Sequence, residues 1–226
     1  MLTRPFLSAV LIALTPVFSW AQAPPTPSPP KAPAPGSSQQ WDQNFRDPKI
    51  KGTEPDRILV SAIANRKPGS AIDLGTGQGR NAIFLAKQAW RTTGVDFSKV
   101  AVEEAQRESL NAGVALELVV ADLELYDLGQ GKWDLINLSF MQAWLKASRM
   151  DNSKRIYDAL RPGGILVIEG FAYQDPRVGI GFKTNDLLRT FDKLKIIRYE
   201  DTFDVPLWGR GPSERRRLLR MIAEKE

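Results

Sequence analysis

Residues 71–86 read AIDLGTGQGRNAIFLA, and this stretch decides the fold. The short apolar run Ala71–Leu74 ends in three glycines at every second position, Gly75, Gly77 and Gly79. Apolar residues at helical spacing follow at once, so the stretch predicts a strand, a glycine-rich turn and a helix. This is the entry unit of a doubly wound α/β sheet, in which a nucleotide-like ligand can approach the turn and the helix N-terminus.

Further short apolar runs follow this unit, separated by helical patterns and turn residues. Because the runs do not alternate with polar residues, they suit strands buried on both faces of a parallel sheet. The chain therefore reads as an open α/β sheet built from successive strand–helix units. The expected strands after the first lie at residues 92–96, 116–121, 133–138 and 165–170.

The C-terminal part has a different pattern. Residues 194–205 alternate well enough for a strand, and residues 206–212 form a turn. Periodicity alone slightly favours a helix over residues 217–224. The tight turn that follows a strand favours an antiparallel hairpin instead, and the hairpin is the prediction adopted here.

The N-terminus has the layout of an export signal. Residues 1–23 carry a positive charge at Arg4, an apolar run and small residues before a cleavage site after Ala23. The expected protein is exported, periplasmic or secreted, without stable membrane insertion after cleavage. A retained membrane anchor is one alternative, and a cytoplasmic protein with a misassigned start is another.

A proline-rich stretch separates this signal from the globular sequence. Residues 24–40 contain seven prolines up to position 35 and end in small and polar residues, which predicts a disordered, extended linker. A docking site for a partner domain is the alternative reading. The folded domain is expected over residues 41–226.

The composition excludes several kinds of chemistry. The chain of 226 residues contains no cysteine and no histidine. Disulfides, thiolate zinc sites, cysteine nucleophiles and histidine bases are therefore excluded, and we expect no metal site. The net charge of +5 is dispersed apart from Arg215–Arg217, which argues against a nucleic-acid partner.

The glycine spacing and three acidic residues restrict the chemical class of ligand that the turn can bind. The GxGxG spacing differs from the dinucleotide fingerprint GxGxxG. Asp73 before the turn would repel a phosphate but suits an ammonium or a sulfonium. Asp96 ends the next strand, where an acid can bind both ribose hydroxyls, and Asp122 follows the third strand, where it can face an adenine amino group. A nucleoside joined to a cationic amino acid fits these acids.

Five ordered motifs give the chain a family resemblance. It resembles the class I S-adenosylmethionine-dependent methyltransferases, and within them the small-molecule group that includes the tellurite-resistance and thiopurine-type enzymes. The resemblance covers about residues 41–226. The motifs are Asp73–Gly79, Asp96, Ala121-Asp122, Trp133–Ile136 and Leu160–Gly164.

The resemblance implies a Rossmann-like sheet of seven strands whose last strand is antiparallel. It also implies methyl transfer from S-adenosylmethionine to a small-molecule acceptor, with residues 137–141 near the cofactor's sulfur. No catalytic base can be named, and oligomeric state is left open. The cofactor site is expected at Asp73, Gly75, Thr76, Gly77, Gly79, Asp96, Phe97, Asp122, Leu123 and Asn137.

Simpler roles compete with these assignments. Asp122 could only cap the turn that follows it, and Asp134 is expected to hold backbone amides rather than to do chemistry. Trp41 and Phe45, four residues apart on one helix face, are either core residues or part of a lid. For the whole protein, the alternative is an exported, non-catalytic module that binds an adenosyl compound or another nucleoside.

Overall fold

The computed structural model describes residues 33–34, 36–50, 52, 54–173, 180–209 and 214–226. The expected signal peptide at residues 1–23 and residues 24–32 of the expected linker lie outside the described residues. Residues 33–226 fold as one unit. Within the described part of the chain, no helix combines the length and apolar character needed to cross a membrane.

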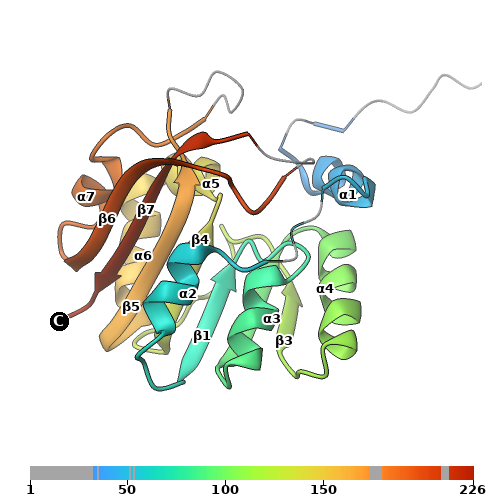
Figure 1. Cartoon of the computed structure of the whole chain (residues 1–226), viewed down its shortest axis with the longest axis horizontal. Coiled ribbons are helices and arrows are strands. Elements are labelled where there is room, and N and C mark those ends of the chain that lie inside the picture. Colours follow the sequence, from blue (N-terminus) through green and yellow to red (C-terminus); the bar gives the residue numbers. More distant parts are fainter. Residues whose placement is uncertain (1–32, 35, 51, 53, 174–179, 210–213) are drawn as a thin grey trace, which may run out of the picture. The chain divides into compact units, whose positions relative to one another are not determined.

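A seven-stranded sheet in the order β3-β2-β1-β4-β5-β7-β6 organises this unit (Figure 1). Strands β1 to β5 are parallel, and β7 runs antiparallel to both β5 and β6. The predicted C-terminal hairpin is thereby confirmed. The strands are β1 (Ser70–Leu74), β2 (Arg91–Asp96), β3 (Glu117–Val120), β4 (Trp133–Ser139), β5 (Leu160–Phe171), β6 (Lys195–Asp204) and β7 (Arg216–Glu224).

Helices cover both faces of the sheet (Figure 1). Apolar side chains of α2 and α3 pack on one face, and those of α5, α6 and α7 pack on the other. Helix α1 lies near the N-terminus of α4, beside the carboxyl ends of the strands. The helices are α1 (Ser38–Arg46), α2 (Arg57–Ile63), α3 (Arg80–Lys87), α4 (Lys99–Asn111), α5 (Gln142–Ala147), α6 (Arg149–Ala159) and α7 (Asp186–Thr190).

Local signals explain where several elements begin. Ser98 caps α4, because its hydroxyl accepts a hydrogen bond from Ala101 N at 3.2 Å. Ser37 caps α1 in the same way through Gln40 N, so this helix begins within the stretch expected to be linker.

Two elements differ from the sequence prediction. Helix α5 was not expected, because its six residues are too few to show a clear helical period. Strand β5 begins at Leu160, five residues earlier than expected. Gly163 takes a φ of +76°, a value that favours glycine, so the chain can bend at this position within the strand.

The parallel strands bring their carboxyl ends to one edge of the sheet. In open α/β sheets this edge is where ligands bind. In the register between neighbours, Asp73 of β1 lies opposite Asn137 of β4 and Gly94 of β2. The predicted motif residues therefore meet at this edge although they are far apart in the sequence.

Candidate functional site

A cavity of about 400 Å³ lies at the carboxyl edge of the sheet. This volume is in the range of small-molecule and cofactor sites. Its walls come from the glycine turn, the ends of β2, β3 and β4, helices α1 and α5, and Trp208 of the β6–β7 connection.

The glycine turn forms one wall of the cavity. Gly75, Gly77 and Gly79 all have positive φ values, of 72°, 54° and 85°. A Cβ at Gly75 would lie 2.3 Å from Met141 Sδ, so a side chain there would collide with the opposite wall. Gly79 plays a different part, because a Cβ there would lie 2.9 Å from Ala105 Cβ. Gly79 thus allows α3 to pack closely on α4 and does not line the cavity.

Asp73 lies beneath the turn. Its two carboxylate oxygens accept hydrogen bonds from Thr76 Oγ1 at 2.8 Å and from Asn137 Nδ2 at 2.7 Å. Burial raises its pKa, and these two hydrogen bonds, together with the charge of Arg80, oppose the rise. Neither Asp73 nor Asn137 lines the cavity, although both were expected beside the cofactor. Because the turn folds over them, they fix its conformation from below.

Asp96 ends β2 in the wall of the cavity. One carboxylate oxygen accepts from Gly77 N at 2.8 Å, and the other accepts from Ser98 N at 2.9 Å. Burial raises the pKa of Asp96 to about 6, although both backbone hydrogen bonds oppose the rise. Each oxygen has a further lone pair, so the carboxylate can still accept hydrogen bonds from a ligand's hydroxyl groups.

Phe97, Asp122 and Leu123 line the cavity next to Asp96. Asp122 also caps its own turn, because Oδ1 accepts from Glu124 N at 3.0 Å. The capping role and the place in the cavity wall therefore both apply to Asp122. Asp134 behaves as expected, since its Oδ2 accepts from Ser70 N at 2.7 Å, away from the cavity.

Aromatic side chains from separate segments form a continuous row, and four of its five members line the cavity. Trp41 and Phe45 of α1 have ring centroids 5.7 Å apart, and Trp41 lies 6.0 Å from Trp208. Trp208 stacks on Phe140 at 5.7 Å, and Phe140 contacts Phe171 at 4.8 Å. We call these five residues the aromatic row. No residue of α1 is buried, so Trp41 and Phe45 are cavity-wall residues rather than core residues.

Phe140 has an unusual backbone. Its φ of +56° is a left-handed value that is strained for a bulky side chain and costs about 1–3 kcal/mol. Its amide nitrogen donates to Glu169 O at 2.7 Å, and its ring is held between Phe171 and Trp208. Strain of this kind clusters at functional sites, and here it turns an aromatic ring into the cavity wall.

A buried ionic cluster supports the part of the cavity wall formed by Arg80 and Asn81, which come directly after the glycine turn in the sequence. Arg80 pairs with Asp56, with 2.6 Å between Nη1 and Oδ1, and the Asp56 side chain is fully buried. Asp56 Oδ2 accepts from Asn81 Nδ2 at 2.9 Å and also from Ser139 Oγ. Residues just before α2 are thereby fastened to the start of α3 and to the end of β4.

A second buried pair lies further along the same edge. Arg220 Nε of β7 donates to Glu169 Oε2 of β5 at 2.5 Å, and its Nη2 donates to Asp204 Oδ2 at 2.8 Å. Burial raises the pKa of Glu169 to about 7, and the nearby Asp56 carboxylate adds to the rise. Within the described residues, no group of three or more acidic, histidine or cysteine side chains could hold a metal ion.

The structure brings seven of the ten predicted site residues into the cavity wall, and only Asp73, Gly79 and Asn137 lie outside it. Ser139, Phe140 and Met141 also line the cavity, as expected for the segment after the fourth strand. No site role was predicted for Trp144 of α5 or for Trp208, although both line the cavity. A tryptophan between Pro206 and Gly209 in a turn was the available signal for Trp208.

Residues 71–164 match the family model of a methyltransferase domain. This segment contains the glycine turn, Asp96 and Asp122, and it continues into β5. A methyltransferase domain of the class I, S-adenosylmethionine-dependent type therefore spans residues 71–164. S-adenosylmethionine is the cofactor of this family.

Known methyltransferases share this fold with low sequence identity. TehB from Haemophilus influenzae superimposes with a TM-score of 0.66 over 74% of this chain and 61% of its own, at 18% identity. The 1,6-didemethyltoxoflavin-N1-methyltransferase of Burkholderia thailandensis, solved with its substrate and S-adenosylhomocysteine, gives a TM-score of 0.62. That alignment covers 88% of this chain and 94% of the other, at 19% identity.

Among curated proteins, the ribosomal RNA small subunit methyltransferase C of Alcanivorax borkumensis is 29% identical over 120 residues. The alignment covers 50% of this chain and 36% of the relative. The chain spans about a third to a half of the length of the curated relatives it matches.

The cavity fits the cofactor of this family on structural grounds. The bare glycine turn leaves room that a Cβ at Gly75 would fill. Asp96 supplies acceptors for hydroxyl groups, and Phe97 and Leu123 supply apolar surface for a base. The wall carries no histidine or cysteine, in accord with a sequence that contains neither.

Proposed function

We propose that this chain binds S-adenosylmethionine at the carboxyl edge of its sheet and transfers the methyl group to a small-molecule acceptor. The observation that supports this most is one cavity that contains the glycine turn, Asp96 and the segment Ser139–Met141. The glycine turn and Asp96 suit a nucleoside with an amino-acid tail. The remaining wall leaves space for a second, small reactant.

The chain's own residues have distinct roles in this proposal. Asp96 accepts hydrogen bonds from the ribose hydroxyls, and Phe97 and Leu123 flank the adenine. The backbone of Gly75 and Gly77 approaches the methionine portion, with Asp73 fixing the turn from below. The bound cofactor supplies a methyl group activated by its sulfonium.

The aromatic row aligns and dehydrates the reactants. Transfer of a methyl group from sulfur is an in-line displacement, so the protein mainly has to orient the acceptor and exclude water. Trp41, Trp208 and Phe140 cover the cavity with apolar rings contributed by three separate segments. We therefore assign the acceptor to the space beneath these rings.

No side chain is assigned as a general base. The chain has no histidine or cysteine, Asp96 holds two backbone amides, and Asp56 is paired with Arg80. A cavity wall without histidine or cysteine favours an acceptor that activates itself, such as a thiolate or another soft anion. Rapid methylation of a neutral alcohol or an unactivated amine would contradict this part of the proposal.

A small acceptor is favoured over a nucleic acid. The net charge of +5 is dispersed, and the cavity wall contains several aromatic side chains but Arg80 as its only cation among the described residues. One relative acts on ribosomal RNA by its name, but it is aligned over only 36% of its length.

Export remains part of the proposal because residues 1–23 have the layout of a signal peptide. The same feature supports a second candidate, an exported module that binds an adenosyl compound without catalysis, since S-adenosylmethionine is made in the cytoplasm. A mature N-terminus near Pro24 in a periplasmic or secreted fraction would support export. An intact Met1 in the cytoplasm would refute it.

Calorimetry with S-adenosylmethionine, followed by a methyl-transfer screen, separates the two candidates. The screen would offer a thiol, selenite, tellurite and a phenol as acceptors. Binding with turnover of any acceptor supports the enzyme, and binding without turnover supports the non-catalytic module. The absence of binding to the wild-type chain would overturn both.

A further inference from the structure

Aromatic side chains make up much of the cavity wall. They include three of the chain's six tryptophans, and each of the aromatic wall residues is only partly buried, so the wall retains surface that a ligand can cover. Aromatic surface in a concave site favours the packing of planar molecules. The aromatic residues of the wall are Trp41, Phe45, Phe97, Phe140, Trp144 and Trp208.

Two of these aromatic residues belong to the nucleoside end of the cavity. Phe97 follows Asp96 directly in the sequence. The Trp144 ring centroid lies 5.9 Å from the Arg155 guanidinium carbon, and Arg155 Nη2 donates a hydrogen bond to Leu123 O at 2.7 Å. Because Asp96 and Leu123 are assigned to the nucleoside, the cofactor accounts for Phe97 and Trp144.

The cofactor does not account for the rings of Phe140 and Trp208. Phe140 directly follows β4, which pairs with β1 on the side away from β2 and β3. The ring of Trp208 stacks on that of Phe140 with 25° between the ring planes, and Trp41 extends this stack from α1. No residue that we assign to the cofactor belongs to this group, so these rings form the wall of the acceptor's space.

Two backbone features hold the rings of Phe140 and Trp208 in place. Phe140 adopts a strained φ of +56°, and its ring is held between Phe171 and Trp208. Gly52 allows the segment that carries Trp208 to come close, because a Cβ at Gly52 would lie 2.5 Å from Leu207 O. A strained residue and a close backbone approach thus both serve to position rings in the wall, as expected where ring orientation matters for a ligand.

The charges of the wall disfavour a small inorganic oxyanion as the acceptor. Arg80 is the only cation among the described wall residues, and its Nη1 already pairs with Asp56 Oδ1 at 2.6 Å. Asp96, Asp122 and Glu124 are acidic wall residues, so negative side chains outnumber positive ones. An oxyanion such as selenite or tellurite would lose its water here without charge-assisted donors in exchange. A planar organic ring has much less hydration to lose.

We propose that the methyl acceptor is a planar aromatic anion whose ring packs against Phe140 and Trp208. This inference rests on the proposed function, because it names the class of acceptor for the same cavity. The ionised atom carried by the ring gives its lone pair to the methyl carbon while the bond from this carbon to the sulfonium breaks. An aromatic thiolate therefore leaves as a neutral methyl thioether, and no proton has to be removed. Phe140 and Trp208 are specificity-determining residues in this account.

The test compares two methyl thioethers that differ only in the ring. Methyl phenyl sulfide has a planar aromatic ring, and methyl cyclohexyl sulfide has a puckered aliphatic ring with the same number of carbons. Isothermal titration calorimetry on the full chain, saturated with S-adenosylhomocysteine, would measure both affinities. Packing against two aromatic rings predicts at least about tenfold tighter binding of the phenyl compound. Burial of apolar surface alone predicts the opposite order, because the cyclohexyl compound is the more hydrophobic of the two.

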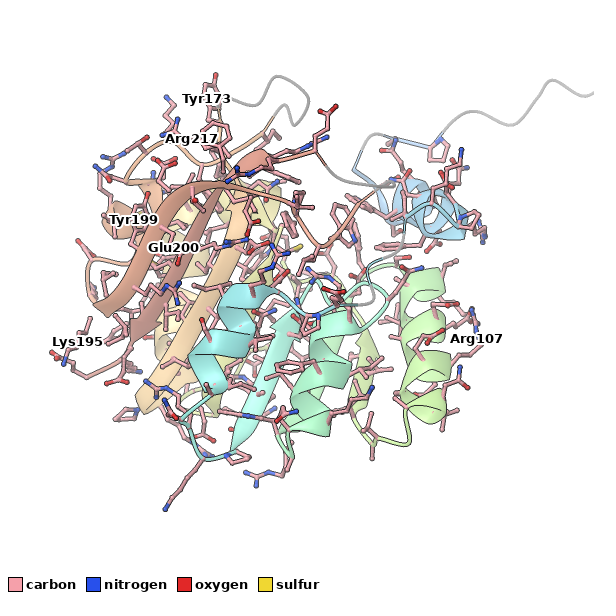
Figure 2. All side chains as sticks on the ribbon, viewed as in Figure 1. Arg107, Tyr173, Lys195, Tyr199, Glu200 and Arg217 are labelled. Atoms are coloured by element: carbon pink, nitrogen blue, oxygen red, sulfur yellow. The ribbon has the colours of Figure 1, made fainter. Side chains whose placement is uncertain are left out.

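Variants of the two rings identify where the ligand packs. Trp208→Leu and Phe140→Leu should each reduce the preference for the phenyl compound about threefold or more, and Trp208→Phe should keep part of it. Tyr173→Leu is the matched control and should keep the wild-type preference. Tyr173 is 53% exposed, lies outside the cavity wall and points outward from the molecule (Figure 2). The two affinities are compared within one variant, so their ratio does not depend on how much of each sample is folded.

Turnover provides a second measurement, in which benzenethiol should be methylated with a higher kcat/KM than selenite or tellurite. The aromatic assignment is overturned, while methyl transfer stands, if selenite or tellurite is the better acceptor. It is also overturned if the cyclohexyl compound binds as tightly as the phenyl compound, or if neither binds. If Trp208→Leu and Phe140→Leu both keep the full preference, the assignment to these rings is overturned. If the chain binds neither S-adenosylmethionine nor S-adenosylhomocysteine, the proposed function itself fails.

Discussion

Asp42 and Ser98 join helix α1 to the first turn of α4. Ser98 Oγ donates a hydrogen bond to Asp42 Oδ1 at 2.5 Å, and Ser98 N donates to Asp96 Oδ1 at 2.9 Å. The helix that carries Trp41 is therefore linked through a single serine to the acid that we assign to the ribose. Since α1 has no buried residue, this contact is a major constraint on its position.

Asp42→Ala should loosen α1 without unfolding the domain. Hydrogen bonds to a charged group contribute about 1.5–3 kcal/mol, and this loss falls on a helix that lies at the surface. Ser98 still caps α4 through Ala101 N, so α4 should remain intact. Hydrogen exchange should show faster exchange in residues 38–46 and unchanged exchange in the sheet.

The matched control for this experiment is Gln43→Ala. Gln43 is exposed on the same helix, and its substitution should leave exchange in α1 close to that of the wild type. Equal protection of α1 in Asp42→Ala and in the wild type would show that other contacts hold the helix over the cavity.

Affinity for S-adenosylmethionine should fall as the pH drops through about 6. Burial raises the pKa of Asp96 to about 6, so the side chain is ionised above this pH and protonated below it. Only the ionised form offers both oxygens as acceptors to the ribose. For a single protonation the affinity falls by up to about tenfold per pH unit below the pKa.

Calorimetry between about pH 5 and about pH 8 checks this expectation. Asp96→Asn should bind at least about tenfold more weakly at neutral pH and show a flatter dependence. The same raised pKa has the opposite sign for folding, because the native state then holds a proton that the unfolded state has lost. The contribution of Asp96 to stability therefore decreases as the pH rises from about 4 to about 6.

Gly75→Ala and Gly113→Ala form a matched pair, because both positions have positive φ, of 72° and 67°. Either alanine should cost about 1 kcal/mol through the backbone alone. A Cβ at Gly75 would also meet Met141 Sδ at 2.3 Å, whereas none of the described atoms lies within 4 Å of one at Gly113.

Thermal unfolding and cofactor titration distinguish these two effects. Gly75→Ala should lower stability by more than Gly113→Ala and should also weaken the binding of S-adenosylmethionine. Gly113→Ala should leave binding unchanged. Equal binding by both variants would mean that the turn does not contact the cofactor.

The sequence predicted the sheet well because local signals and global topology agree in this chain. Apolar runs, glycine turns and the Ser98 cap each identify an element without tertiary information. The hairpin of β6 and β7 was the exception, since periodicity over residues 217–224 favoured a helix slightly. The turn before this segment and the family resemblance predicted the hairpin correctly. In the structure β7 pairs with both β5 and β6, and this pairing explains why the segment is a strand.

Only those site residues that belong to recognisable sequence motifs were predicted. Gly75, Asp96 and Asp122 lie at the carboxyl ends of strands or within two residues of them, so their place at the edge follows from topology alone. Asp73 precedes the turn in the sequence, but only the structure shows that Thr76 and Asn137 occupy its oxygens. Contacts between segments far apart in the chain determine which groups bond to Asp73, and a single sequence does not show these contacts.

The aromatic row and the buried ion pair of Arg80 show the same limit. Trp41, Phe140 and Trp208 come from three segments whose proximity depends on the completed fold. The ion pair between Arg80 and Asp56 likewise joins the start of α3 to a residue that precedes α2.

Glu169 and Arg220 make stability depend on pH in a direction that can be measured. Burial raises the pKa of Glu169 to about 7, well above the usual value of about 4.3 for an unfolded chain. Between these two values the native state binds a proton that the unfolded state has released. The Glu169 contribution therefore lowers the free energy of unfolding as the pH rises from about 4 to about 7.

Glu169→Gln should remove this part of the pH dependence, because a neutral amide has no proton to bind. It should cost little at neutral pH, where the native carboxyl is partly protonated. Arg220→Met should be far more damaging, by about 3–5 kcal/mol, because it leaves Glu169 buried without its cation and removes the partner of Asp204. Urea unfolding of both variants at about pH 5 and about pH 8 gives the comparison. A Glu169→Gln variant with the wild-type pH slope would place the titrating group elsewhere, and Arg220→Met as stable as the wild type would show that the buried pair contributes nothing net to folding.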